Sequence, residues 1–199
     1  MKVPQLSEAS VRELLVTELL LSPCAILAIR GYYLDTMGEL GVNDVGVYDD
    51  AMFFVGPGVF RSVRANTDPS KLGYNAAVGK PFAMLQPGTW PFIRGTHKGR
   101  SPALRQLDEE TADEYGLANH GHFKVWRARS MQEVREGSAR TDEGYFAINI
   151  HSGGVASTSS WGCLTIPPSA YLNFMEQVWQ SMIGQGIKII YVKLIEGLQ

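Results

Sequence analysis

His151 and Cys163 are the two residues of this sequence whose types and spacing could carry out nucleophilic chemistry. They stand twelve positions apart, and a loop rich in serine and glycine joins them. A cysteine thiol is a good nucleophile as the thiolate, and a neighbouring imidazole is the commonest group that lowers its pKa. If the two residues lie at the ends of two strands, the loop can bring their side chains together. The pair therefore indicates a cysteine enzyme that transfers acyl groups.

Each residue also has a plain structural interpretation. His151 could be a histidine whose ring is satisfied by hydrogen bonds at a strand end, and Cys163 could be a small buried hydrophobic residue. Ser159, Ser160 and Gly162 favour the catalytic interpretation, because a buried structural cysteine does not need them. Backbone amides beside a nucleophile can stabilise a developing negative charge, and glycine lets backbone and substrate approach closely.

Two segments resemble a known family. Ser160–Leu164 (Ser-Trp-Gly-Cys-Leu) resembles the L,D-transpeptidase catalytic domain, also called the YkuD domain, which has a strand-borne histidine, a loop, and Ser-X-Gly-Cys before an apolar residue. Leu85–Trp90 resembles the Pro-X-Gly-X-aromatic turn ahead of that site, so the resemblance covers about residues 82 to 166. Asn43–Asp44, Tyr48–Asp50 and Asn66–Ser70 also resemble segments of uncharacterised phage-encoded proteins.

The resemblance implies roles for four residues. Cys163 would be the nucleophile and His151 its base, while Gly162 would shape the oxyanion site and Ser160 would orient the loop. The spacing of twelve is shorter than is usual in the family. The departures at single positions are Thr165, where the family usually has arginine, and Trp161, where it usually has histidine, lysine or arginine. These departures leave the nucleophile intact and bear on donor recognition.

Other residues are expected to contact the substrate. Arg94 and Arg105 suit a substrate carboxylate, because a guanidinium group binds one with two hydrogen bonds. His97 follows an expected strand and could line the cleft, although a solvated loop histidine is an equal alternative. The predicted substrate-binding residues are therefore His97, Trp161, Arg94, Arg105 and Thr165.

No metal or other cofactor is expected. His120 and His122 share a glycine-rich loop, but no cysteine or carboxylate cluster stands beside them in the sequence. The aspartates at 44, 49, 50 and 68 could form a calcium or amine site. They are better interpreted as turn formers, because no twelve-residue calcium-loop pattern is present.

Composition limits the class of protein. The 199 residues are 45% hydrophobic and 19% charged, which suits one globular domain with a real core. The formal charge of -2 argues against nucleic acid as a partner. Cys24 and Cys163 are too few for a disulfide framework. The most apolar N-terminal stretch, 14–29, contains Glu18 and Pro23, so neither a signal peptide nor a membrane span is expected.

Hydrophobic periodicity and turn residues predict the elements. A helix is expected over Ser7–Ser22, and an amphipathic helix with Tyr171, Leu172, Met175, Val178, Trp179 and Met182 on one face. Strands are expected at Ala25–Leu34, Met52–Val55, Val59–Ala65, from Trp90 through Ile93 towards His97, at Phe123–Arg129, Phe146–Ile150 and Ile187–Ile195, with a short helix or loop at Ala103–Tyr115.

These elements indicate a mostly β fold of the α+β class. We expect a compact mixed β-sandwich like that of L,D-transpeptidases, with an N-terminal helix and one amphipathic helix after the catalytic cysteine. The chain is expected to form a single catalytic domain over 1–199, with 1–24 as a helical extension.

The expected function is acyl transfer on bacterial peptidoglycan stem peptides, by hydrolysis or by transpeptidation. The protein would be made in the cytoplasm without a signal peptide and would act on the periplasmic cell wall after release or delivery, as a phage lysis enzyme or an antibacterial effector does. An immunity protein or phage lysis partner is not identified by the sequence. Two alternatives remain open: a cell-wall-binding module without turnover, and a phage structural protein.

Overall fold

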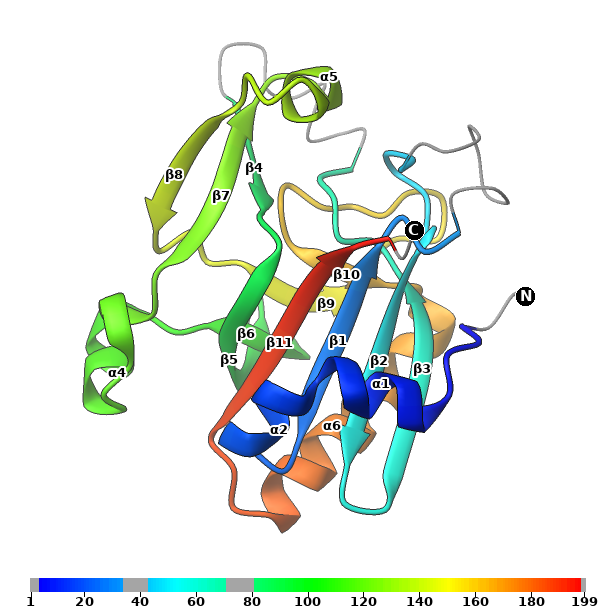
Figure 1. Cartoon of the computed structure of the whole chain (residues 1–199), viewed down its shortest axis with the longest axis vertical. Helices are drawn as coiled ribbons and strands as arrows, with labels where there is room; N and C mark the ends of the chain where they lie inside the picture. The colour runs from blue at the N-terminus through cyan, green and yellow to red at the C-terminus, as the bar shows by residue number, and fades with distance from the viewer. Residues whose placement is uncertain (1–3, 34–42, 71–80, 198–199) are drawn as a thin grey trace.

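The computed structural model describes residues 4–33, 43–70 and 81–197. Its main feature is an eight-stranded sheet (Figure 1). In spatial order the strands are β10 (Leu164–Ile166), β9 (Asn149–Ser152), β6 (Ser101–Gln106), β5 (Gly88–His97), β11 (Ile189–Glu196), β1 (Ala25–Arg30), β2 (Asp50–Gly56) and β3 (Val59–Ala65). The pairs β1–β11 and β9–β10 are parallel, and the other neighbours are antiparallel.

The two edges of this sheet meet. Directly after β3, the backbone of Asn66 exchanges two hydrogen bonds of 2.8 Å with the backbone of Thr165 in β10. The sheet is therefore nearly closed into a barrel, and the edge strand β10 is not left unpaired on its outer side.

The inner face of the sheet carries the larger hydrophobic core. Side chains alternate between the two faces of a strand, so Ile26, Phe92 and Leu104 point inward. The long helix α6 (Pro168–Gly184) packs on this face, with Tyr171, Phe174, Met175, Val178 and Met182 buried. A three-stranded sheet of β4 (Phe82–Leu85), β7 (Phe123–Ala128) and β8 (Arg140–Gly144) contributes Leu85, Phe123 and Val125 to the same core.

The outer face is covered by the N-terminal helices where it is formed by β1, β2 and β11. Helices α1 (Glu8–Leu14) and α2 (Val16–Leu21) cross in front of these strands (Figure 1). Val11 and Leu15 pack against a second core cluster that includes Leu27 and Phe53. Helices α1 and α2 do not extend over the outer face of β9 and β10, and the candidate site lies on that uncovered part of the sheet.

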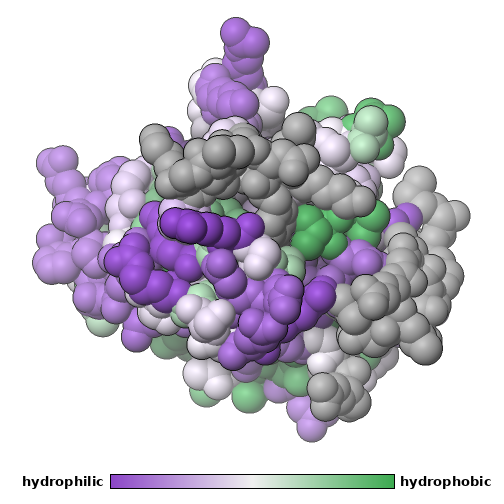
Figure 2. Space-filling view, turned by 90° about the horizontal axis from the view of Figure 1, so that it is seen from above, coloured by the Kyte–Doolittle hydropathy of each residue, from purple (hydrophilic) through white to green (hydrophobic). Residues whose placement is uncertain are grey.

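Short helices complete the described chain: α4 (Glu109–Glu114), the 3-10 helix η1 (Ala118–Gly121) and α5 (Met131–Arg135). The N-terminal caps of α4 and α5 are the side chains of Asp108 and Ser130, which accept from backbone amides. Seen from above, the described surface is largely hydrophilic with a small hydrophobic area (Figure 2).

The mostly β, α+β class is confirmed, and β3 has the predicted bounds. Other predictions need correction. The single N-terminal helix is two helices, because the dihedral angles of Leu15 (φ -101°, ψ 14°) leave the helical region. The strand predicted over Ala25–Leu34 ends at Arg30, and Leu34 itself lies outside the described residues. On α6, Leu172 faces solvent instead of the core.

Four strands, β4, β6, β8 and β10, are not among the predicted ones. β4 ends just before the turn at Gln86 and Pro87, and β8 is a polar edge strand. The region predicted as a short helix or loop begins instead with β6 and continues into α4. The histidine-bearing strand starts at Asn149, later than predicted, so His151 lies within it.

No helix in the described part of the chain is long and apolar enough to span a membrane.

Candidate active site

His151 lies on the outer face of β9. Its neighbour Ile150 is part of the inner core, so Asn149 and His151 must project from the other face. Asn149 pairs with Arg105 in β6, and His151 pairs with Thr165 in β10. Side chains from three adjacent strands therefore share this face.

Cys163 precedes β10 by one residue and joins the same face. The register that sets Thr165 opposite His151 sets Cys163 opposite Asn149, whose backbone N–H donates a hydrogen bond to Sγ at 3.4 Å. Cys163 is therefore a diagonal neighbour of His151 on adjacent strands. Its thiol is free, and the residue is partly buried. The structure therefore places the two residues that the sequence paired on neighbouring strands, although no hydrogen bond joins their side chains among the described residues.

The imidazole of His151 is held in one orientation. Its Nδ1 lies 2.7 Å from the carbonyl oxygen of Ser152 and donates a hydrogen bond to it. Its ring stacks on the ring of His97, with centroids 3.8 Å apart and planes 9° apart. Because Nδ1 carries the proton, Nε2 is the atom that can accept one.

Burial opposes a charge on either partner. Burial, the charge of His97 and the charge of Lys98 lower the pKa of His151 to about 4, although the hydrogen bond to Ser152 opposes this. Burial raises the pKa of the Cys163 thiol, opposed by the amide of Asn149 and by Lys98. These shifts run against the lowering of the thiol pKa that the sequence suggests for a cysteine beside an imidazole.

Ser160 holds the loop that carries the cysteine. Its Oγ accepts a hydrogen bond from the amide of Gly162 at 3.0 Å and donates one to the carbonyl of Cys163. Its own carbonyl accepts from the amide and the hydroxyl of Ser70, each at 2.8 Å. These contacts agree with the predicted role of Ser160, which was to orient the loop.

Gly162 is required by the backbone and by its surroundings. Its φ is +141°, and a Cβ at this position would lie 2.2 Å from the carbonyl oxygen of Ala83 in β4. Its amide is already bound to Ser160, so it does not face a substrate oxygen. The amide of Cys163 has no acceptor among the described residues, and it is the better candidate for stabilising an oxyanion.

Two of the predicted substrate-binding residues, His97 and Arg105, lie at this face, and His97 contacts His151 directly. Trp161 lies in the loop two positions before the cysteine and is 66% exposed. The side chain of Arg105 extends over Gly95 of the neighbouring strand β5: a Cβ added at Gly95 would lie 2.6 Å from Cδ of Arg105. Gly95 therefore makes room for the arginine stem.

The structure does not support contact of Arg94 or Thr165 with a substrate at this face. Arg94 pairs with Leu104, whose side chain is in the inner core, so Arg94 projects away from His151. Thr165 pairs with His151 but is completely buried, where the Asn66 backbone covers β10. The prediction for Arg94 is wrong because side chains alternate between the two faces of a strand. The prediction for Thr165 is wrong because the closure of the sheet buries this residue.

Two residues of the site were missed. Asn149 bonds to Cys163 through its backbone, and its Nδ2 donates to Nδ1 of His97 at 3.4 Å. It stands two positions before His151, so strand periodicity could have identified it. Lys98, in the turn between β5 and β6, influences the pKa of His97, His151 and Cys163. No sequence pattern marks it.

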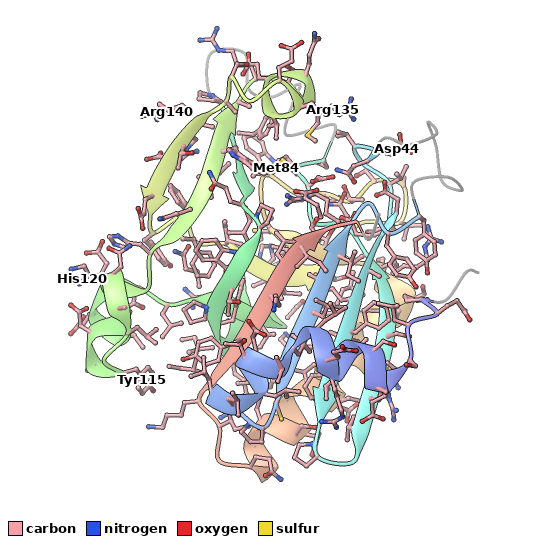
Figure 3. All side chains as sticks on the ribbon, in the orientation of Figure 1. Asp44, Met84, Tyr115, His120, Arg135 and Arg140 are labelled. Carbon is pink, nitrogen blue, oxygen red and sulfur yellow. The ribbon has the colours of Figure 1, made fainter. Side chains whose placement is uncertain are left out.

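The other histidines lie elsewhere. His120, at the outer edge of the molecule beside α4 (Figure 3), contacts Asp113 at 2.7 Å, and His122 contacts Glu109 at 2.7 Å. Each imidazole therefore has its own carboxylate. Within residues 4–33, 43–70 and 81–197, no group of three or more His, Cys, Asp or Glu side chains could hold a metal ion.

The aspartate-rich segments organise loops around β1 and β2, although Gly41 and Val42 lie outside the described residues. Asp50 accepts from the amides of Gly31 and Thr67, and Asp68 forms a buried ion pair of 2.9 Å with Arg30. Burial raises the pKa of Asp49 to about 7. These contacts agree with the interpretation of the aspartates as turn formers.

No family model, curated protein or solved structure matches this chain.

Proposed function

We propose that the protein is a cysteine-dependent acyl-transfer enzyme acting on bacterial peptidoglycan stem peptides. The observation that carries the proposal is the placement of the free, partly buried Cys163 on the same sheet face as His151, whose Nδ1–H is fixed by the carbonyl of Ser152. A nucleophile, a base and a group that orients the base form the arrangement that activated nucleophiles need.

The geometry supports a two-step reaction. Nε2 of His151 accepts the Sγ proton while Sγ attacks the substrate carbonyl, and the Cys163 amide is available to the oxyanion. Cleavage of the C–N bond gives a thioester, and the imidazolium returns its proton to the leaving amine. Water or a second amine then attacks the thioester with His151 again as base. This step restores the thiol.

The stem peptide as substrate rests on the resemblance of Ser160–Leu164 and Leu85–Trp90 to the L,D-transpeptidase domain. The charges around the site agree with that choice. Lys98 and Arg105 lie at the site, and neither forms a salt bridge with a described residue. Two cations favour a peptide that carries free carboxylates.

We propose hydrolysis as the net outcome, in a phage or delivered antibacterial setting at the periplasmic cell wall. Position 165, where the family usually has arginine, here holds a buried threonine. A group that would recognise the donor is therefore missing from that position.

Incubation with purified muropeptides, followed by separation and mass analysis of the products, tests this function. We expect shortened stem peptides and no new cross-links. New cross-links without any shortened stems would contradict hydrolysis as the net reaction. Unchanged muropeptides would contradict any enzymatic activity on this substrate.

The raised pKa of Cys163 favours one alternative, a cell-wall-binding module without turnover. Under that alternative, the Cys163→Ala variant still binds to sacculi, and the parent protein does not cleave or cross-link them. Comparing alkylation rates of Cys163 and Cys24 does not separate the two cases, because Cys24 is completely buried. The informative comparison is Cys163 alkylation with and without His151→Gln.

A further inference from the structure

The site contains two imidazoles instead of one. The rings of His97 and His151 are parallel and 3.8 Å apart, so each covers one face of the other. Nδ1 of His97 accepts from Asn149 at 3.4 Å, and Nδ1 of His151 donates to Ser152 at 2.7 Å. Both rings are therefore fixed by hydrogen bonds from β9.

Two stacked imidazoles cannot both carry a proton at low cost. At this separation the two positive charges repel strongly in a partly desolvated site. His151 is 5% exposed, whereas His97 is only partly buried, so a charge on His97 loses less hydration. The first proton that the pair binds therefore goes to His97, and its charge opposes a second proton on His151.

Asn149 can serve both protonation states of His97. Its Nδ2 donates to the neutral ring, while its Oδ1 is buried and has no hydrogen-bond partner. If the side-chain amide of Asn149 rotates so that its oxygen and nitrogen exchange places, Oδ1 can accept a hydrogen bond from the protonated Nδ1 of His97. Protonation of His97 would then leave its ring in place.

Lys98, in the turn that follows β5, acts in the same direction, because it lowers the pKa of both histidines. Arg105 reaches across β5 from β6, and the Cys163 thiol stands before β10. No described carboxylate forms an ion pair with His97 or His151.

We propose that His97 is a positioning residue that keeps His151 available as a proton acceptor in mildly acidic surroundings. It holds the ring by stacking, and it binds the first proton that the pair takes up. This inference rests on the proposed function, because it assigns His97 a role in the pH range of that chemistry instead of a contact with substrate.

Ring signals of the four histidines, followed by NMR as the pH is lowered, test the proposal. His97→Phe keeps an aromatic ring on His151 but binds no proton. We expect the titration midpoint of His151 to rise by roughly one pH unit in this variant, because the repelling charge is gone. The acidic limb of the pH–activity profile should move upward with it. A purely structural role of His97 would change neither.

His120→Ala removes an exposed, distant imidazole and is the matched control, for which the midpoint of His151 should not move. If His97→Phe fails to fold, as judged by the dispersion of its amide spectrum, His97→Gln replaces it with the same expected shift. An unchanged His151 midpoint in the folded variant overturns the proposal. If the midpoint rises but the parent protein forms no acyl adduct, the proposed function fails and the effect of His97 stands.

Discussion

Cys163→Ala is expected to abolish muropeptide turnover, and His151→Gln to reduce it by about 10²–10⁴-fold. The first change removes the sulfur that forms the thioester. The second leaves the thiol but removes the imidazole that is proposed to accept its proton, and the pKa of that thiol is already raised by burial. Initial rates of stem-peptide cleavage at neutral pH measure both effects.

Cys24→Ala is the matched control, because Cys24 is the only other cysteine and lies in the inner core. It should keep the rate of the parent protein once folding is confirmed. Retention of the full rate by Cys163→Ala would show that another group performs the chemistry.

Gly162→Ala is expected to lower the free energy of unfolding by about 3 kcal/mol or more. The new methyl group would lie 2.2 Å from the carbonyl oxygen of Ala83, at a φ of +141° that side chains rarely adopt. The loop or β4 must move, and either movement displaces Cys163. Thermal unfolding should show a midpoint lower by roughly 6–12 °C for a chain of this size.

Gly58→Ala separates strain from collision. Gly58 also has a positive φ, +69°, but a Cβ there would meet nothing within 4 Å. It should cost about 1 kcal/mol, from the backbone strain alone. Equal losses in the two variants would mean that the contact between Gly162 and β4 does not constrain the site.

The sequence was sufficient for the parts of the fold that local patterns determine. The core face of α6 follows a helical period, and the turn at Gly56–Gly58 sets the β2–β3 hairpin. The convergence of His151 and Cys163 could also be predicted, because a loop joining two neighbouring strands brings their ends together. What the sequence could not show was which face of the sheet carries them.

Long-range pairing decides the rest. β6 was missed because its polar residues look like a loop, yet it is buried between β5 and β9. The stacking of His97 on His151 joins residues 54 positions apart and depends on that pairing. Burial of Thr165 depends on the contact between β3 and β10, which no local pattern encodes.

The charge state of the site depends on burial as well as on residue type. A cysteine beside a histidine suggests an ion pair when only the sequence is considered. Desolvation lowers the pKa of His151 and raises that of Cys163, so the neutral pair is favoured at rest. Under the proposed function, the thiol would therefore lose its proton to His151 during the attack on the substrate.

Intact-protein mass spectrometry during reaction with purified muropeptides tests whether Cys163 forms a covalent intermediate. We expect a transient mass increase equal to an acylated stem fragment, located on Cys163 by peptide mapping and absent from Cys163→Ala. Turnover with no adduct under rapid quenching, or an adduct on any other residue, would contradict it.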